Sequence, residues 1–181
     1  MEQNKLNFAL SQQDYSLKDG LTLLTSMYKG VYIQRESGVS RNYLVMATRG
    51  YQLGTLRRFP DRYVDQLNET IIRIGQQLMQ TRITEDDTLA QLKTLAEKIP
   101  LQNIFANYLG WSEGKLKQRL YAKSGNMYGK FEPDTINKVN EALAAMAMKT
   151  LMIHLVYAEQ ENTPKSEESA TAVQESCKKT D

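Results

Sequence analysis

The chain has 181 residues, a formal net charge of +2, one cysteine and one histidine. These numbers exclude a disulfide framework and any cluster of histidines at a metal or nucleophile site, and the low cysteine content is typical of a reducing compartment. No signal-peptide pattern opens the sequence, and its most apolar stretch, 143–158, is too short to span a bilayer. We therefore expect a cytoplasmic protein with no membrane partner, no metal and no cofactor.

The first half of the chain has helical periodicity after a flexible arm at 1–13. Gly38 and Pro60 interrupt this periodicity, and Ser40 is a suitable residue to cap a helix that follows it. The spacing of the apolar residues between these interruptions predicts helices at 17–27, 32–36, 41–48 and 60–78.

The second half shows the same order of signals. Thr84 and Ser112 are candidate helix caps, Gly110 ends a short helix, and Pro133 precedes the last helix. We expect helices at 85–98, 101–109, 113–121 and 134–158. The remaining segment, 159–181, carries six acidic residues against three lysines and has few branched apolar side chains, a composition that predicts a disordered acidic tail.

Shifting the chain by 72 positions aligns the two halves without a gap. Identical or similar residues then coincide at the turn, at the cap and along the apolar stripe of the closing helix. The matched pairs are Gly38 with Gly110, Ser40 with Ser112, Leu44 with Leu116, Phe59 with Phe131, Val64 with Ile136, Leu67 with Val139, Asn68 with Asn140, and Ile71 with Leu143. This register predicts a tandem duplication, with a first unit at 14–82 and a second unit at 83–158.

The turns resemble the helix-turn-helix of lambda-repressor-like DNA-binding domains. That pattern has a small residue, a glycine four positions later, an apolar residue next, and a branched apolar residue six positions after the glycine. The second unit matches it with Ala106, Gly110, Trp111 and Leu116, whereas the first has Gln34 at the small position and then Gly38, Val39 and Leu44. The chain is also similar to small helix-turn-helix-like proteins of the Bacteroidetes and their mobile elements.

The resemblance implies an all-α fold of two tandem four-helix units, with an overlong closing helix that covers the first unit or pairs two chains as a homodimer through 143–158. It also implies that the second helix of each turn enters the major groove of DNA. Carried over by position, the base-contacting residues would be Ser40, Arg41, Asn42, Arg49, Ser112, Lys117 and Gln118.

Positive charge lies in two blocks of the sequence, around each predicted turn. Residues 29–62 hold seven basic and two acidic side chains, and residues 103–130 hold five basic and one acidic. Basic blocks of this kind suit contacts with phosphate groups. The residues that we expect to make such contacts are Arg57, Arg58, Lys115, Arg119, Lys123 and Lys130.

The sequence thus predicts a DNA-binding protein, a transcriptional regulator of a bacterial or mobile-element genome, whose partner is double-stranded DNA. A second interpretation is a non-catalytic protein-interaction or structural module that keeps the fold without DNA contacts. Four residues favour it: Val45 and Met46 are apolar on the expected exposed face, Glu113 would repel phosphates, and Gly114 weakens its helix. No catalytic constellation is present in the sequence, and we expect no enzyme.

Overall fold

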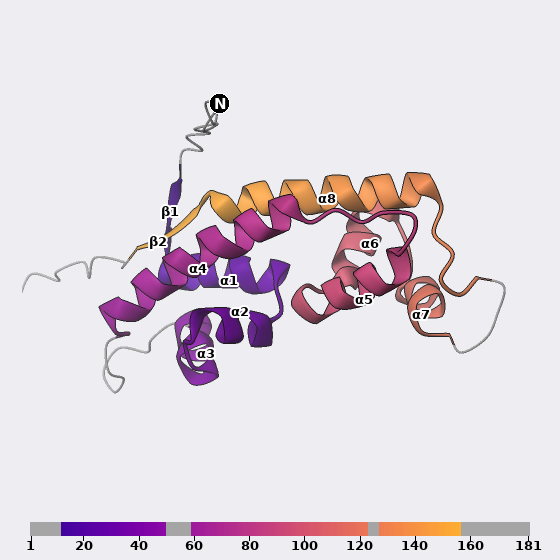
Figure 1. Ribbon diagram of the computed structural model, residues 1–181. Coiled ribbons are helices and arrows are strands. Elements are labelled where there is room, and N and C mark those ends of the chain that lie inside the picture. The colour runs from indigo at the N-terminus through magenta and orange to yellow at the C-terminus, as the bar shows by residue number, and fades with distance from the viewer. Residues whose placement is uncertain (1–11, 50–58, 123–126, 157–181) are drawn as a thin grey trace, which may run out of the picture.

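The computed structural model of the protein describes residues 12–49, 59–122 and 127–156 (Figure 1). Within these ranges the chain forms eight helices and two short strands. In order they are β1 (Gln13–Ser16), α1 (Leu17–Met27), α2 (Gly30–Ser37), α3 (Arg41–Arg49), α4 (Asp61–Gln80), α5 (Thr88–Lys98), α6 (Leu101–Leu109), α7 (Glu113–Tyr121), α8 (Pro133–Leu151) and β2 (Ile153–Val156). The predicted helical class is confirmed, and a two-stranded sheet is added to it. The expected arm, apart from residues 12 and 13, and the expected tail lie outside the described residues.

Two predicted helix boundaries are wrong by three residues or more, and α2 begins two residues earlier than predicted, at Gly30. Helix α5 begins at Thr88 instead of residue 85, with Asp87 at its N-cap. The predicted cap, Thr84, lies before the helix and is tied to it by the Gln91 side chain, which accepts from the Thr84 amide at 2.8 Å and donates to its hydroxyl at 3.0 Å. Helix α8 ends at Leu151 instead of near 158. Beyond it, Ile153 and Leu155 alternate with less buried residues, which is the two-residue period of a strand.

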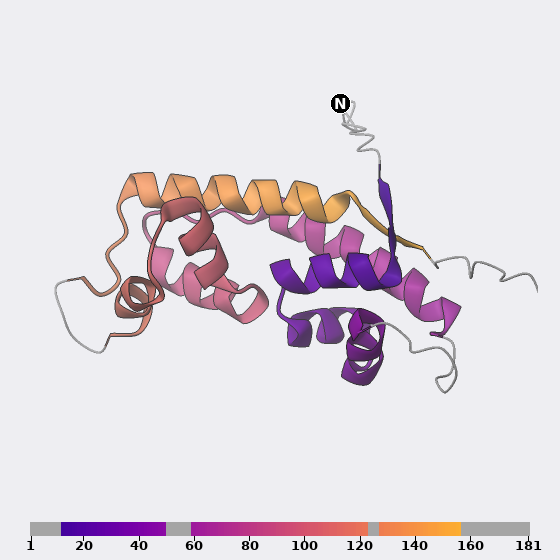
Figure 2. The same ribbon diagram turned by 180° about the vertical axis from the view of Figure 1, so that it is seen from behind.

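Helices α4 and α8 form the long axis of the molecule (Figures 1 and 2). They pack against each other in opposite directions, and their repeated apolar stripes are in the core: Leu67, Ile71, Val139 and Leu143 are each no more than 1% exposed. Gly75 of α4 lies so close to α8 that a Cβ atom there would stand 2.8 Å from Leu151 Cγ. Helix α8 therefore packs along α4 in the first half of the chain, although it is shorter than the predicted closing helix.

Each long helix carries an asparagine that holds a backbone segment by two hydrogen bonds. The side chain of Asn68 on α4 donates to the Leu155 carbonyl at 3.0 Å and accepts from the Leu155 amide at 2.8 Å. Asn140 on α8 does the same for Ile83, at 2.9 and 2.8 Å. Because Leu155 and Ile83 are at most 3% exposed, these asparagines satisfy buried peptide groups that water does not reach. We call the two arrangements the asparagine clamps.

The two strands join the beginning and the end of the described chain. Strand β1 pairs with β2 in parallel, with Gln13 opposite Ile153 and Ser16 opposite Val156. The single histidine, His154, falls within the predicted helix 134–158; instead it lies on β2, half-exposed, with its Nδ1 atom 2.8 Å from the Asp14 carboxylate. A segment that precedes the first helix and a segment that follows the last helix are thus held side by side.

Candidate nucleic-acid interface

A glycine in the left-handed conformation connects α2 to α3, and a second connects α6 to α7. Gly38 has φ +70° and donates to the Gln34 carbonyl, while Gly110 has φ +65° and donates to the Ala106 carbonyl. These backbone angles favour glycine, because a Cβ atom is strained there. Six positions after each glycine stands a core leucine, Leu44 or Leu116, that is 5% exposed. The two turns therefore have equivalent geometry at the aligned positions.

The N-terminal ends of α3 and α7 are open to solvent. Of the expected base-contacting residues, all are exposed: Ser40, Arg41, Asn42, Arg49, Ser112, Lys117 and Gln118. Val45 and Met46, which were expected on the exposed face, are half-buried, so α3 presents less apolar surface than its sequence suggests. Both helices therefore offer mainly polar groups to a partner.

Helix α7 carries an internal ion pair that α3 lacks. Glu113 Oε1 lies 2.6 Å from Lys117 Nζ, and the two side chains are 53% and 66% exposed. An exposed pair of this kind contributes little stability, so a polyanion can displace the carboxylate at small cost. The Ser112 hydroxyl caps α7 by accepting from the Lys115 amide at 3.3 Å. Lys117 is thus available to a partner only in competition with Glu113.

An aromatic cluster attaches α7 to the beginning of α8. Trp111 stacks on Phe131 with an angle of 9° between the rings, and it contacts Phe105 with centroids 5.1 Å apart. Lys115 Nζ lies 4.2 Å from the centre of the Trp111 ring, a cation–π contact that leaves the ammonium group on the surface.

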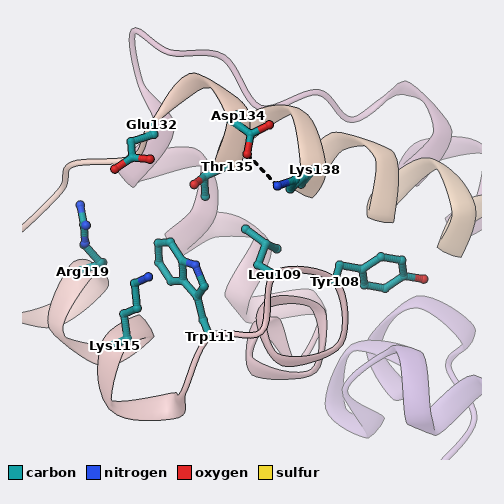
Figure 3. Close-up of a pocket in the computed structure, with 9 residues that line it drawn as sticks. All are labelled: Tyr108, Leu109, Trp111, Lys115, Arg119, Glu132, Asp134, Thr135 and Lys138. Atoms are coloured by element: carbon teal, nitrogen blue, oxygen red, sulfur yellow. Dashed lines mark ion pairs between the residues drawn. The ribbon is translucent and has the colours of Figure 1, made fainter.

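Trp111 and Lys115 border a shallow pocket of about 220 Å³ between α7 and the beginning of α8 (Figure 3). Asp134 pairs with Lys138 at 2.7 Å on its rim, and the hydrogen bond with that carboxylate raises the pKa of Lys138. Glu132 lies on the same rim, so carboxylates face the pocket as well as cations. The pocket therefore does not form a uniformly basic anion site.

The expected phosphate-contacting residues have different positions. Lys115 and Lys130 are exposed. Arg119 is only 7% exposed, and its guanidinium donates to the Lys130 carbonyl, so this side chain holds the loop that follows α7. The other three, Arg57, Arg58 and Lys123, lie outside the described residues.

Sequence reasoning missed Arg62, an exposed cation beside α3. Its guanidinium lies 5.0 Å from the centre of the Tyr63 ring, and Tyr63 in turn contacts Tyr43 of α3 with ring centroids 5.0 Å apart. The signal that could have found it is position, because Arg62 occupies the first turn of α4 and follows Arg57 and Arg58 closely in the sequence. It places a cation next to the exposed end of the first unit.

Helices α3 and α7 lie on the side of the molecule away from α8, at opposite ends (Figures 1 and 2). Helix α3 packs on α1 and α2, and α7 packs on α5 and α6. Helix α3 is therefore supported by helices of the first half of the chain, and α7 by helices of the second half.

No family model matches this chain, and no curated protein or solved structure matches it. None of the helices in the described ranges has the length and apolar character needed to cross a membrane. Among the same residues, no three acidic, histidine or cysteine side chains gather in a way that could hold a metal ion.

Proposed function

We propose that this protein binds double-stranded DNA through α3 and α7, as a regulator with two helix-turn-helix units in one chain. The observation that carries the proposal is the placement of the two exposed helix ends on one side of the molecule, each after an equivalent glycine turn. A helix presented in this way enters the major groove and reads base edges with its N-terminal side chains.

The chemistry of the exposed residues supports this proposal. Arg41 and Asn42 have the donors and acceptors that pair with guanine and adenine, and Gln118 has the amide that pairs with adenine. Lys115, Lys130 and Arg62 supply exposed positive charge near these residues, where the phosphate backbone would pass. Because phosphate contacts release counterions, binding should weaken steeply as salt is raised.

The test begins with selection of the sequences that wild type binds from a random-sequence duplex library. Binding of the selected duplexes is then titrated at several salt concentrations. We expect wild type to bind at low salt, and both R41A/N42A and K117A/Q118A to bind sequences selected by wild type at least about tenfold more weakly. Lys149→Ala is the matched control for charge, because Lys149 is exposed on α8, away from α3 and α7. Absence of wild-type binding at the lowest salt would refute the proposal.

A second candidate function concerns α7 alone. The Glu113–Lys117 pair and the exposed rings of Tyr108 and Tyr121, which are 53% and 57% exposed, favour a protein contact at this end of the molecule. If that is its role, K117A/Q118A will leave DNA affinity unchanged while R41A/N42A lowers it.

A further inference from the structure

The two asparagine clamps are reciprocal. Asn68 lies in the first unit and holds the segment that follows α8, whereas Asn140 lies in the second unit and holds the segment that follows α4. In the 72-residue register, Asn68 corresponds to Asn140, and Ile83 corresponds to Leu155. The contact of Asn68 with Leu155 therefore corresponds to the contact of Asn140 with Ile83. Two copies that contact each other in this way, with i touching j and j touching i, are related by a two-fold axis.

The packing of α4 against α8 agrees with this axis. Along α4, Asn68 contacts Leu155 of β2 and Gly75 lies against Leu151 of α8, so residue numbers fall along α8 and β2 as they rise along α4. Equivalent helices that run antiparallel exclude a simple translation between the units, which would keep them parallel. The duplicated chain is therefore folded as a two-fold dimer within a single polypeptide.

This symmetry also relates α3 to α7, which are equivalent helices at the two ends of the same side (Figures 1 and 2). Two reading helices related by a two-fold axis face the duplex in opposite directions, whereas units repeated by translation would face it in the same direction. The order of the units along the chain does not determine this direction, whereas the packing of α4 against α8 does.

The residues at equivalent exposed positions are different. Arg41 corresponds to Glu113, Asn42 to Gly114, and Arg49 to Tyr121. An arginine and a glutamate at one position prefer different bases, because the first donates to guanine and the second accepts from cytosine.

We propose that a single chain binds one duplex at two half-sites that are inverted in orientation and unequal in sequence, an inference that rests on the proposed DNA-binding function. A second copy is not required to complete the site, because both reading helices belong to one polypeptide.

The experiment makes the two reading helices alike. In the variant E113R/G114N/K117V/Q118M/Y121R, α7 receives the residues of α3 at the equivalent positions, which are exposed in α7. Wild type and variant are each used to select from a random-sequence duplex library. We expect wild type to enrich two dissimilar half-sites, and the variant to enrich an inverted repeat, which it binds at least about tenfold more tightly than the same half-sites arranged as a direct repeat.

The other outcomes are separable. Enrichment of a direct repeat, or of a single half-site, by the variant overturns the inference while leaving DNA binding intact. Failure of wild type to bind any duplex at low salt is instead a failure of the proposed function. The reverse exchange in α3, R41E/N42G/V45K/M46Q/R49Y, repeats the test with the half-site of the second unit if the first variant does not fold. For every selected duplex, sedimentation should give one chain per duplex.

Discussion

The two halves of the chain have similar orders of helices, but they fix α3 and α7 with different side chains. In the first unit, Tyr43 on α3 makes edge contacts with Phe59 and Tyr63. In the second unit the position of Tyr43 is occupied by Lys115, and Trp111 supplies the ring that contacts Phe131. The aromatic group has thus moved from the helix to the turn before it. The comparison teaches that equivalent helices can keep the same place after the glycine turn, while the residues that hold them, and those they expose, differ.

The largest difference between the units should appear at the shared phenylalanine. Phe59 is 2% exposed, whereas its equivalent Phe131 is half-exposed beneath Trp111. We expect Phe59→Ala to lower the free energy of unfolding by about 3–5 kcal/mol, and Phe131→Ala by roughly half as much, because less buried surface is lost. Urea denaturation of both variants measures this. Equal losses of unfolding free energy in the two variants would show that Phe59 and Phe131 are equally buried in solution.

The asparagine clamps should behave alike if the two-fold relation holds. Asn68→Ala and Asn140→Ala each leave a buried amide and carbonyl without a partner, so each should lower the free energy of unfolding by about 1–3 kcal/mol. Hydrogen exchange should quicken at the Leu155 amide in the first variant and at the Ile83 amide in the second.

Asn107→Ala is the control for the clamps, because Asn107 is exposed on α6 and its replacement should leave the free energy of unfolding nearly unchanged. A loss in only one of the two clamp variants would contradict the reciprocal arrangement.

The two turn glycines should give equal and smaller effects. Gly38 and Gly110 both have positive φ, and a Cβ atom at either position would meet no neighbour within 4 Å. Substitution by alanine therefore adds backbone strain alone, about 1 kcal/mol in each unit. Gly114→Ala is the matched control of opposite sign, since Gly114 lies within α7 and alanine should stabilise a helix there by up to about 1 kcal/mol. Thermal unfolding of the three variants checks the signs.

The smallest effect at neutral pH concerns Tyr28, whose equivalent in the second unit is Pro100. Its hydroxyl lies 2.9 Å from that of Thr150 on α8, and burial raises the pKa of Tyr28 to about 12, although the hydrogen bond with Thr150 opposes the rise. Because the folded pKa exceeds the ordinary value of 10, the contribution of the neutral phenol is complete below pH 10 and is lost as the pH rises through 12.

Tyr28→Phe should therefore destabilise the protein by only about 1 kcal/mol at pH 7 and should weaken the alkaline loss of stability. Denaturation at pH 7 measures the destabilisation, and its comparison with denaturation at pH 11 measures the alkaline loss of stability. Tyr121→Phe, at an exposed ring, is the control. A wild-type-like alkaline profile in Tyr28→Phe would assign the loss to another group.

The helical elements could be predicted from sequence because their signals are local. Glycine at positions 38 and 110, serine at 112 and proline at 133 each act within one turn of the chain. The α8–β2 boundary could not be found in the same way, since Ile153 and Leu155 become a strand only when β1 and the Asn68 clamp are present. The sequence shows that both equivalent positions, 68 and 140, carry asparagine. It does not show that these side chains bind backbone groups, because those groups are far away along the chain.

The candidate site follows the same rule. Exposure of Arg41 and Asn42 followed from the turn pattern, whereas the burial of Arg119 did not, because it depends on a carbonyl in the loop after α7. The relative direction of α3 and α7 was also beyond sequence reasoning. A repeat register gives the equivalence of two segments, but the symmetry operation that relates them is a property of packing.

The Asn68 clamp has a consequence for synthesis on the ribosome. The segment that fills it, around Leu155, is translated 72 residues after the equivalent segment around Ile83. At a synthesis rate of about 5–20 residues per second, the Asn68 clamp stays empty for roughly 4 to 14 seconds after the segment around Ile83 has been made. Within the ranges that the structure describes, β1 pairs with β2 alone, so the described part of the first half gives this strand no partner during the same interval. The half of the protein that is made first is therefore completed last, and its final step is the arrival of the end of the second half.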